Sequence, residues 1–182
     1  LVDDLELIAG PHLAGEIASS IKDNGGVYLV PAFVGLSAPY WDSEAKALIY
    51  GMTRGAKKAH IVRAAEESIA YQIKDILDLM IKESRINLTE LRVDGGPTRD
   101  EFPMQFQANM LDVPLIRSQI KELSALGAAY ISGLATGFWK DKKEITSLRV
   151  ADATFTNQIS AAKRRELYKG WKEAVRRSLS KF

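Results

Sequence analysis

The stretch Leu91-Arg-Val-Asp-Gly-Gly96, followed by Asp100, decides how the rest of the chain can fold. A buried strand predicted over residues 88–93 ends in two glycines, and a helix is predicted to begin near Asp100. Because glycine has no Cβ, a ligand can come close to the backbone at this turn. The N-terminus of a helix offers free N–H groups that favour a phosphate or a polar ring edge. By itself, the pattern fits a ligand site and an unliganded tight turn equally well.

Helices are predicted on both sides of this strand. Residues 57–84 repeat apolar side chains every three or four positions, which gives that helix one apolar face. Glu67 lies near this face, so a buried structural hydrogen bond is expected of it. Further helices are predicted over residues 100–111 and 124–139, with a short strand over 113–117 between them. Strands that alternate with helices predict an α/β fold with some parallel strands.

The two ends of the chain show weaker and different patterns. Residues 1–8 resemble the end of a helix, and the apolar run over residues 27–33 predicts another buried strand. Residues 34–55 are rich in glycine, proline and aromatic side chains and predict an ordered loop. From about Ser160 the sequence predicts an amphipathic helix with an apolar stripe made of Leu167, Trp171, Val175 and Leu179.

The helix at the C-terminal end is strongly basic, with eight Lys or Arg against two Glu from residue 163 onward. One interpretation is a surface for a membrane or a nucleic acid. The other is a packed terminal helix whose cations lie in water, and the narrow apolar stripe, broken by Gly170, favours it. No nucleic-acid partner is therefore expected.

Two further stretches have both a functional and a structural interpretation. Gly127 and Gly133 remove bulk from the helix over residues 124–139, which favours close packing over contact with a flat ligand. A loop with two aromatics, a carboxylate and an arginine is compatible with a polyol site. We favour an alternative in which the loop is held by its aromatics and a salt bridge. Its residues are Tyr40, Trp41, Asp42 and Arg54.

Composition excludes several functional classes. The chain has no cysteine, so disulfides, zinc–thiolate sites and cysteine nucleophiles are excluded. Its two histidines, His12 and His60, are far apart in sequence, and a histidine-rich metal site is not expected. No apolar run reaches the ~18 residues of a membrane span, and the acidic start is unlike a signal peptide. A cytoplasmic protein is expected, and the absence of an initiator Met suggests that the sequence begins inside a longer chain.

Several of these stretches together, in this order, resemble the C-terminal part of the FGGY carbohydrate kinases, and of the glycerol kinases among them in particular. The resemblance extends from the first residues to about residue 145. The matching runs are Gly26–Phe33, Gly35–Asp42, Gly51–Gly55, Glu67–Gln72, Leu91–Gly96, Met104–Gln107, Ala125–Ala129, Gly133–Ala135 and Gly137–Trp139.

The resemblance implies a ribonuclease-H-like, actin-type ATPase fold, truncated at its N-terminus. Residues 1–150 would form the nucleotide-binding domain without its opening strands, and residues 151–182 a C-terminal extension with the basic amphipathic helix. The implied reaction is the transfer of phosphate from ATP to glycerol, with Mg²⁺, in a homo-oligomer. The alternatives are another FGGY sugar or polyol kinase and a non-catalytic nucleotide-binding relative.

The same resemblance assigns few site residues to this chain. Gly95 and Gly96 match the glycine pair whose backbone meets the nucleotide. The family has an asparagine near the adenine where this chain has Asp100, and an ionised aspartate accepts hydrogen bonds but donates none. The family's catalytic aspartate, phosphate loops and glycerol-binding residues match no part of this sequence. The chain alone is therefore predicted to be inactive, with no catalytic and no metal-binding residue of its own.

Overall fold

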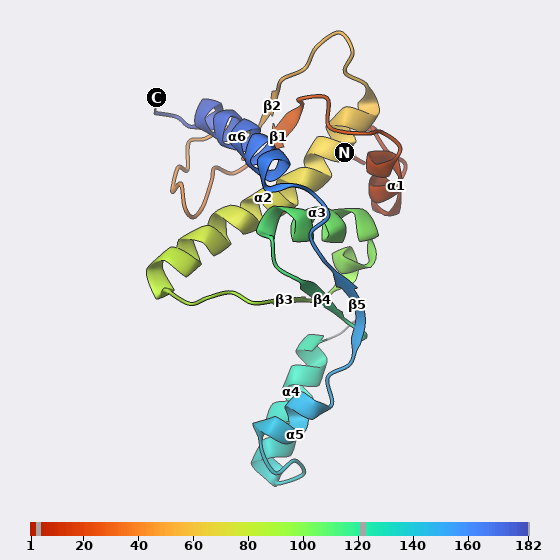
Figure 1. The fold of residues 1–182 in the computed structure, drawn as a ribbon, viewed down its shortest axis with the longest axis vertical. Coiled ribbons are helices and arrows are strands. Elements are labelled where there is room, and N and C mark those ends of the chain that lie inside the picture. The colour runs from red at the N-terminus through yellow and green to blue at the C-terminus, as the bar shows by residue number, and fades with distance from the viewer. Residues whose placement is uncertain (3–4, 121–122, 182) are drawn as a thin grey trace.

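The computed structural model describes residues 1–2, 5–120 and 123–181 (Figure 1). Two small sheets and one long helix organise the chain. The elements, in order, are η1 Pro11–Leu13, α1 Ala14–Ser19, β1 Tyr28–Val30, β2 Leu48–Tyr50, α2 Lys58–Ser84, β3 Leu91–Val93, η2 Gly96–Arg99, α3 Glu101–Leu111, β4 Leu115–Ser118, α4 Leu123–Thr136, α5 Lys142–Ser147, β5 Ala151–Phe155 and α6 Ala161–Ser178.

The sheet that positions the Gly95-Gly96 turn has the strand order β3-β4-β5. β3 and β4 are parallel, with Leu91 opposite Leu115, and they are connected through α3. This βαβ unit brings the carboxyl ends of both strands to one edge of the sheet, where ligands bind in open α/β sheets. β5 then adds antiparallel to β4. The predicted α/β fold with parallel strands is confirmed.

The core lies where α2, α3 and α6 meet the antiparallel pair β1-β2. Tyr71 of α2 is 1% exposed and stacks on Trp171 of α6, with ring centroids 5.3 Å apart. It also meets the edge of the Phe106 ring of α3 at 5.4 Å. Aromatic pairs in such arrangements add about 0.5–1.5 kcal/mol to the free energy gained by burial alone. Helix α6, predicted as an amphipathic helix, is thus an integral part of the core.

Glu67 fulfils the structural role expected of it. Its side chain is buried at 1% exposure and accepts hydrogen bonds from Arg63 at 2.7 Å and from Asn24 at 3.0 Å. Arg63 in turn donates to the carbonyl of Ile21 at 2.6 Å. The carboxylate therefore connects α2 to the segment that leads into β1.

Several elements differ from the sequence-based predictions. The predicted helix over residues 1–8 is wrong for the described residues there, because Leu7 N–H bonds the Leu1 carbonyl and Glu6 has φ 48°. The predicted loop over 34–55 contains β2, which pairs with β1. Helices α1 and α5 and strand β5 were not predicted, since each is short and lacks a clear apolar period.

Helix α4 ends three residues earlier than predicted, at Thr136. Gly137 takes φ 76° and the chain turns back, so that Phe138 N–H bonds the Gly133 carbonyl at 2.8 Å. The turn places Trp139 against Gly133, where a Cβ would lie 2.2 Å from the indole ring. Close packing is therefore the reason for Gly133, as the sequence favoured.

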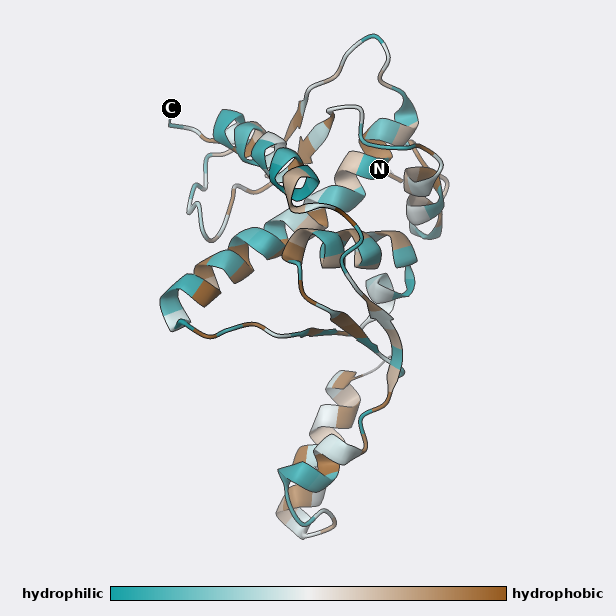
Figure 2. Ribbon diagram, in the orientation of Figure 1, coloured by the Kyte–Doolittle hydropathy of each residue, from teal (hydrophilic) through white to brown (hydrophobic). Residues whose placement is uncertain are grey.

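Apolar side chains remain exposed on two parts of the molecule. Helices α4 and α5 extend away from the β3-β4-β5 sheet (Figure 1), and brown, hydrophobic stretches are visible along α4 and along α2 (Figure 2). On α2, Ile69, Ile76 and Met80 are 44%, 41% and 57% exposed. These three residues belong to the apolar face that predicted the helix, so only part of that face is covered within this chain.

Candidate functional site

The turn after β3 is open, as a ligand site at this position requires. Gly95 has φ 94°, a conformation that side-chain-bearing residues avoid, and Gly96 opens the short helix η2. A Cβ placed on either glycine would meet no protein atom within 4 Å. Thr98 fixes the turn, because its hydroxyl donates to the Gly95 carbonyl at 2.8 Å. The two glycines therefore present bare backbone to open space.

A cavity of about 620 Å³ adjoins this turn. Its volume falls within the ~300–1,000 Å³ common for small-molecule and cofactor sites. The cavity lies where η1 and α1, the α2 segment around Glu66, and η2 with the start of α3 come together. Its lining residues are Pro11, His12, Glu16, Glu66, Ile69, Gly96, Pro97, Arg99, Asp100, Glu101, Pro103 and Met104.

Asp100 contributes to this cavity and also caps α3. Its Oδ1 accepts a hydrogen bond from Phe102 N–H at 3.0 Å, which satisfies one of the free donors of the first helical turn. The carboxylate packs against Gly15 of α1, where a Cβ would lie 2.0 Å from both oxygens. Because Gly15 has no side chain, α1 leaves room for Asp100 at the wall of the cavity.

The cavity wall is acidic. Burial, and then the nearby Asp100 carboxylate, raise the pKa of Glu66 from 4.5 to about 6. Glu16 and Glu101 add further carboxyl groups to the lining. Arg99, the one arginine of the lining, is engaged by Asp152 at 3.0 Å and by the Ser118 carbonyl at 3.2 Å.

Sequence reasoning missed an ion-pair network that connects the segment after the Gly95-Gly96 turn to β4 and β5. Asp152 of β5 accepts from Arg99 at 3.0 Å and from Arg117 at 2.8 Å. Arg117, which is 9% exposed, also donates to the Thr98 carbonyl at 3.0 Å. The three charged side chains join η2, β4 and β5. Residues 117 and 152 are 35 positions apart, so no local sequence pattern signals the pairing.

The loop that contains Tyr40, Trp41 and Asp42 is held in place by contacts within the protein, as favoured above. Hydrogen bonds, and not the expected salt bridge, hold it. The Tyr40 hydroxyl donates to Asp75 at 2.7 Å. The Asp42 carboxylate accepts from Ser180 N–H at 2.7 Å, and this bond lowers the pKa of Asp42. Trp41 is 78% exposed. Tyr40 and Asp42, two of the four side chains that suggested a polyol site, thus bind the chain itself.

The described residues contain no group of three or more His, Asp and Glu side chains placed to hold a metal ion. None of the described helices is long and apolar enough to cross a lipid bilayer.

Comparison with known proteins places the chain in a class. Residues 7–136 match the C-terminal domain of the FGGY family of carbohydrate kinases. The chain belongs to this family, and its mixed α/β architecture is that of the actin-like ATPase fold.

Within the family, this chain is a homologue of the C-terminal domain of glycerol kinases. It is 51% identical over 97% of its length to glycerol kinase of Brachyspira hyodysenteriae, and 52% identical over 98% to glycerol kinase 2 of Thermotoga maritima. It superposes on a crystal structure of Plasmodium falciparum glycerol kinase with ADP at a TM-score of 0.90, with 38% identity over 97% of this chain and 35% of that one. A ligand-bound xylulose kinase from Lactobacillus acidophilus gives a TM-score of 0.82 at 25% identity, covering 93% of this chain and 35% of that one. The chain spans 36% of the length of these two curated relatives.

Proposed function

We propose that this chain is the nucleotide-binding part of an ATP-dependent glycerol kinase, which converts glycerol and ATP to glycerol 3-phosphate and ADP. The observation on which the proposal rests is the open Gly95-Gly96 turn at the carboxyl end of β3, beside a cavity of about 620 Å³. The identity of about 51% to glycerol kinases supports the choice of reaction.

The geometry supports a specific orientation of the nucleotide. The bare backbone of Gly95 and Gly96 allows a phosphate or ribose to approach, and the cavity beside it accommodates a base. Asp100 lies at the wall of this cavity, where its free lone pairs can accept from an amino group such as that of adenine. The solved relative from Plasmodium falciparum was crystallised with ADP.

The residues of this chain do not supply the chemistry of phosphate transfer. Such transfer depends on positioning and on cations that neutralise the charge on the moving phosphoryl group. We propose that Mg²⁺ is held mainly by the nucleotide phosphates, by water and by parts of the enzyme outside this chain. No catalytic base is assigned, and we propose that the chain alone phosphorylates no glycerol.

The exposed apolar side chains of α2 support a role as one part of a larger enzyme. Ile76 and Met80 lie on one side of a helix whose opposite side is core. β3 is an edge strand of its sheet, with β4 as its one partner among the described strands. We propose that the N-terminal part of the kinase covers these surfaces, and assembly into a homo-oligomer stays a prediction.

A chimeric enzyme tests the proposed function. In glycerol kinase 2 of Thermotoga maritima, the segment that aligns with this chain, 36% of that protein's length, would be replaced by this chain. ATP-dependent phosphorylation of glycerol would then be measured. We expect an active chimera, and a rise in the KM for ATP on Gly96→Val. A folded chimera that binds glycerol but no ATP would contradict the proposal. Activity on another polyol alone would favour a different FGGY kinase.

A further inference from the structure

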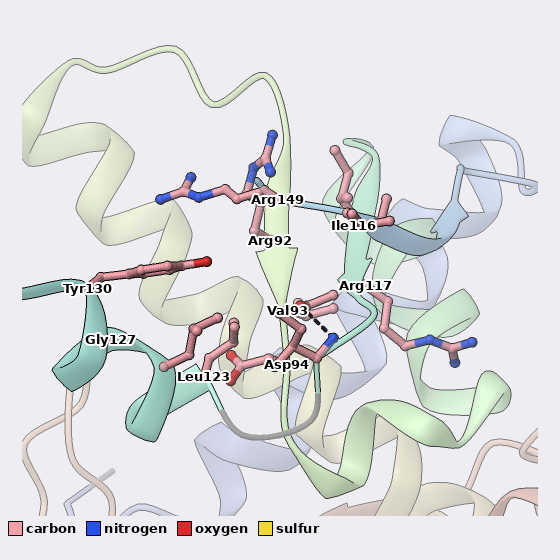
Figure 3. Close-up of a pocket in the computed structure, with 14 residues that line it drawn as sticks. Arg92, Val93, Asp94, Ile116, Arg117, Leu123, Gly127, Tyr130 and Arg149 are labelled. Atoms are coloured by element: carbon pink, nitrogen blue, oxygen red, sulfur yellow. Dashed lines mark hydrogen bonds between the residues drawn. The ribbon is translucent and has the colours of Figure 1, made fainter. Parts of the chain in front are cut away.

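A second cavity, of about 350 Å³, lies on the other side of the β3 turn (Figure 3). It is enclosed by β3, β4, the first turns of α4 and the segment that enters β5. Its lining shares no residue with the cavity beside Gly96: Asp94 lines the one and Gly96 the other. The proposed nucleotide site therefore leaves this cavity unassigned. The lining residues are Arg92, Val93, Asp94, Ile116, Arg117, Ser118, Ile120, Leu123, Leu126, Gly127, Tyr130, Arg149, Val150 and Ala151.

Two arginines give one end of this cavity a positive charge. Arg92 uses its Nε to bind Glu90 at 2.8 Å, which leaves both terminal nitrogens without a partner in the described part of the chain. Arg149 has no hydrogen-bond partner among the described residues. Figure 3 shows both side chains at the end of the cavity away from Asp94, with one of the two guanidinium groups extending toward the side on which the Tyr130 ring lies. A third arginine, Arg117, is already paired with Asp152.

Apart from Asp94, Arg117 and Ser118, the rest of the lining is apolar. Val93, Ile116 and Val150 come from the three strand segments, and Leu123, Leu126 and the ring of Tyr130 come from α4. Gly127 faces the cavity without a side chain, and a Cβ there would meet no atom within 4 Å. The second glycine of α4, Gly133, is explained by its contact with Trp139, whereas Gly127 has no such contact. Its effect is to leave space in the cavity.

We propose that this cavity binds a phosphomonoester whose organic part is apolar. Two guanidinium groups can each donate two parallel hydrogen bonds to a phosphate, and arginine suits this geometry better than lysine. The Tyr130 hydroxyl, which also has no partner among the described residues, supplies a further donor. The apolar walls take up the organic part of the ligand, and the space above Gly127 sets its thickness.

A fluorescent phosphomonoester, 1-naphthyl phosphate, serves as the probe, titrated into the 182-residue chain. We expect Arg92→Gln and Arg149→Gln each to weaken binding about tenfold, since each removes charge-assisted hydrogen bonds to the phosphate. Gly127→Leu, which fills the cavity and suits a helix better than glycine, should abolish binding while the circular dichroism spectrum stays unchanged. Arg165→Gln, at an exposed position on α6, removes the same charge and should have no effect.

Further control titrations distinguish binding in this cavity from nonspecific binding and from nucleotide binding beside Gly96. Inorganic phosphate and glycerol 3-phosphate should bind much more weakly than the probe, because neither fills the apolar walls. Gly96→Val should leave probe binding intact. Three outcomes would each overturn the proposal. Arg92→Gln and Arg165→Gln could lose the same amount of probe affinity, inorganic phosphate could bind as tightly as the probe, or ADP could displace the probe competitively. Failure of the wild-type chain to bind ADP, with the probe site intact, would count against the proposed function alone.

Discussion

Trp171 donates its indole N–H to the Asp75 carboxylate at 2.7 Å, which ties the C-terminal helix α6 to α2 inside the core. The same carboxylate, 4% exposed, accepts from the Tyr40 and Tyr168 hydroxyls. Lys172 lies 3.6 Å away and provides the opposite charge. Three donors and one cation thus compensate a buried anion, and this arrangement joins the aromatic loop, α2 and α6.

Removing this carboxylate should destabilise the whole chain. Asp75→Ala leaves the buried Trp171 indole N–H and the half-buried Tyr40 and Tyr168 hydroxyls without their acceptor. We expect a loss of about 3–5 kcal/mol in the free energy of unfolding, since an unsatisfied buried donor costs about 1–3 kcal/mol. Asp78→Ala on the same helix removes an exposed ion pair with Lys74 and should cost about 0.5 kcal/mol or less. Urea unfolding followed by tryptophan fluorescence measures both. Similar losses in the two variants would contradict the role given to Asp75.

Glu66 should make stability depend on pH in a defined direction. Its folded pKa of about 6 lies above the ordinary value of 4.5, so the folded state holds a proton that the unfolded state has released. Stability from this group is therefore present below pH 4.5 and is lost as the pH rises to about 6. Relative to Glu66→Gln, the wild type should lose stability across this window. A difference between the two proteins that stays constant with pH would refute the assignment.

Asp100→Asn should strengthen nucleotide binding without harming the fold. Asparagine caps a helix as well as aspartate does, so α3 should remain intact. The substitution removes a negative charge from the cavity wall, which lowers repulsion of the nucleotide phosphates and lowers the pKa of Glu66. Calorimetric titration with ADP would measure the change. Unchanged binding would show that Asp100 does not face the nucleotide, and weaker binding would show that its hydrogen bond to the base outweighs the repulsion of the phosphates.

The exposed face of α2 should determine association with the remainder of the enzyme. Replacing Ile76 and Met80 by glutamine removes apolar contact area but leaves helix propensity nearly unchanged. Ile69 is kept, because it also lines the cavity beside Gly96. The variant should fail to bind the N-terminal part of a related glycerol kinase, whereas the wild-type chain binds it. Glutamine at Ile131 and Phe138, exposed on and just after α4, is the matched control. Undiminished binding by the α2 variant would place the contact elsewhere.

Local patterns in the sequence predicted the helices with a clear apolar period and the open turn. The periods of α2 and α6 are long, and the glycine pair follows a strand, so each signal lies within one segment. β5 could not be predicted in this way, because Ala151-Asp-Ala-Thr-Phe155 is mostly exposed and becomes a strand by pairing with β4. The hydrogen bond from Trp171 to Asp75 spans 96 positions and also leaves no local trace.

The sequence also left some roles of single side chains at the candidate site unpredicted. Asp100 was predicted from the family resemblance to lie near a nucleotide. Its residue type also suits the cap of α3, but its packing against Gly15 depends on a second helix. The raised pKa of Glu66 arises from α2 packing against the start of α3. Such effects depend on which helices meet, which only the folded chain determines.

Titration of ADP into the chain, compared with its Gly96→Val and Gly127→Val variants, tests the central claim most directly. Neither position has a positive φ or a neighbour within 4 Å of an added Cβ, so both variants should fold. We predict that the wild type and Gly127→Val bind ADP alike, and that Gly96→Val binds it at least tenfold more weakly. Equal affinity in all three proteins would contradict the claim that the nucleotide meets the open turn after β3.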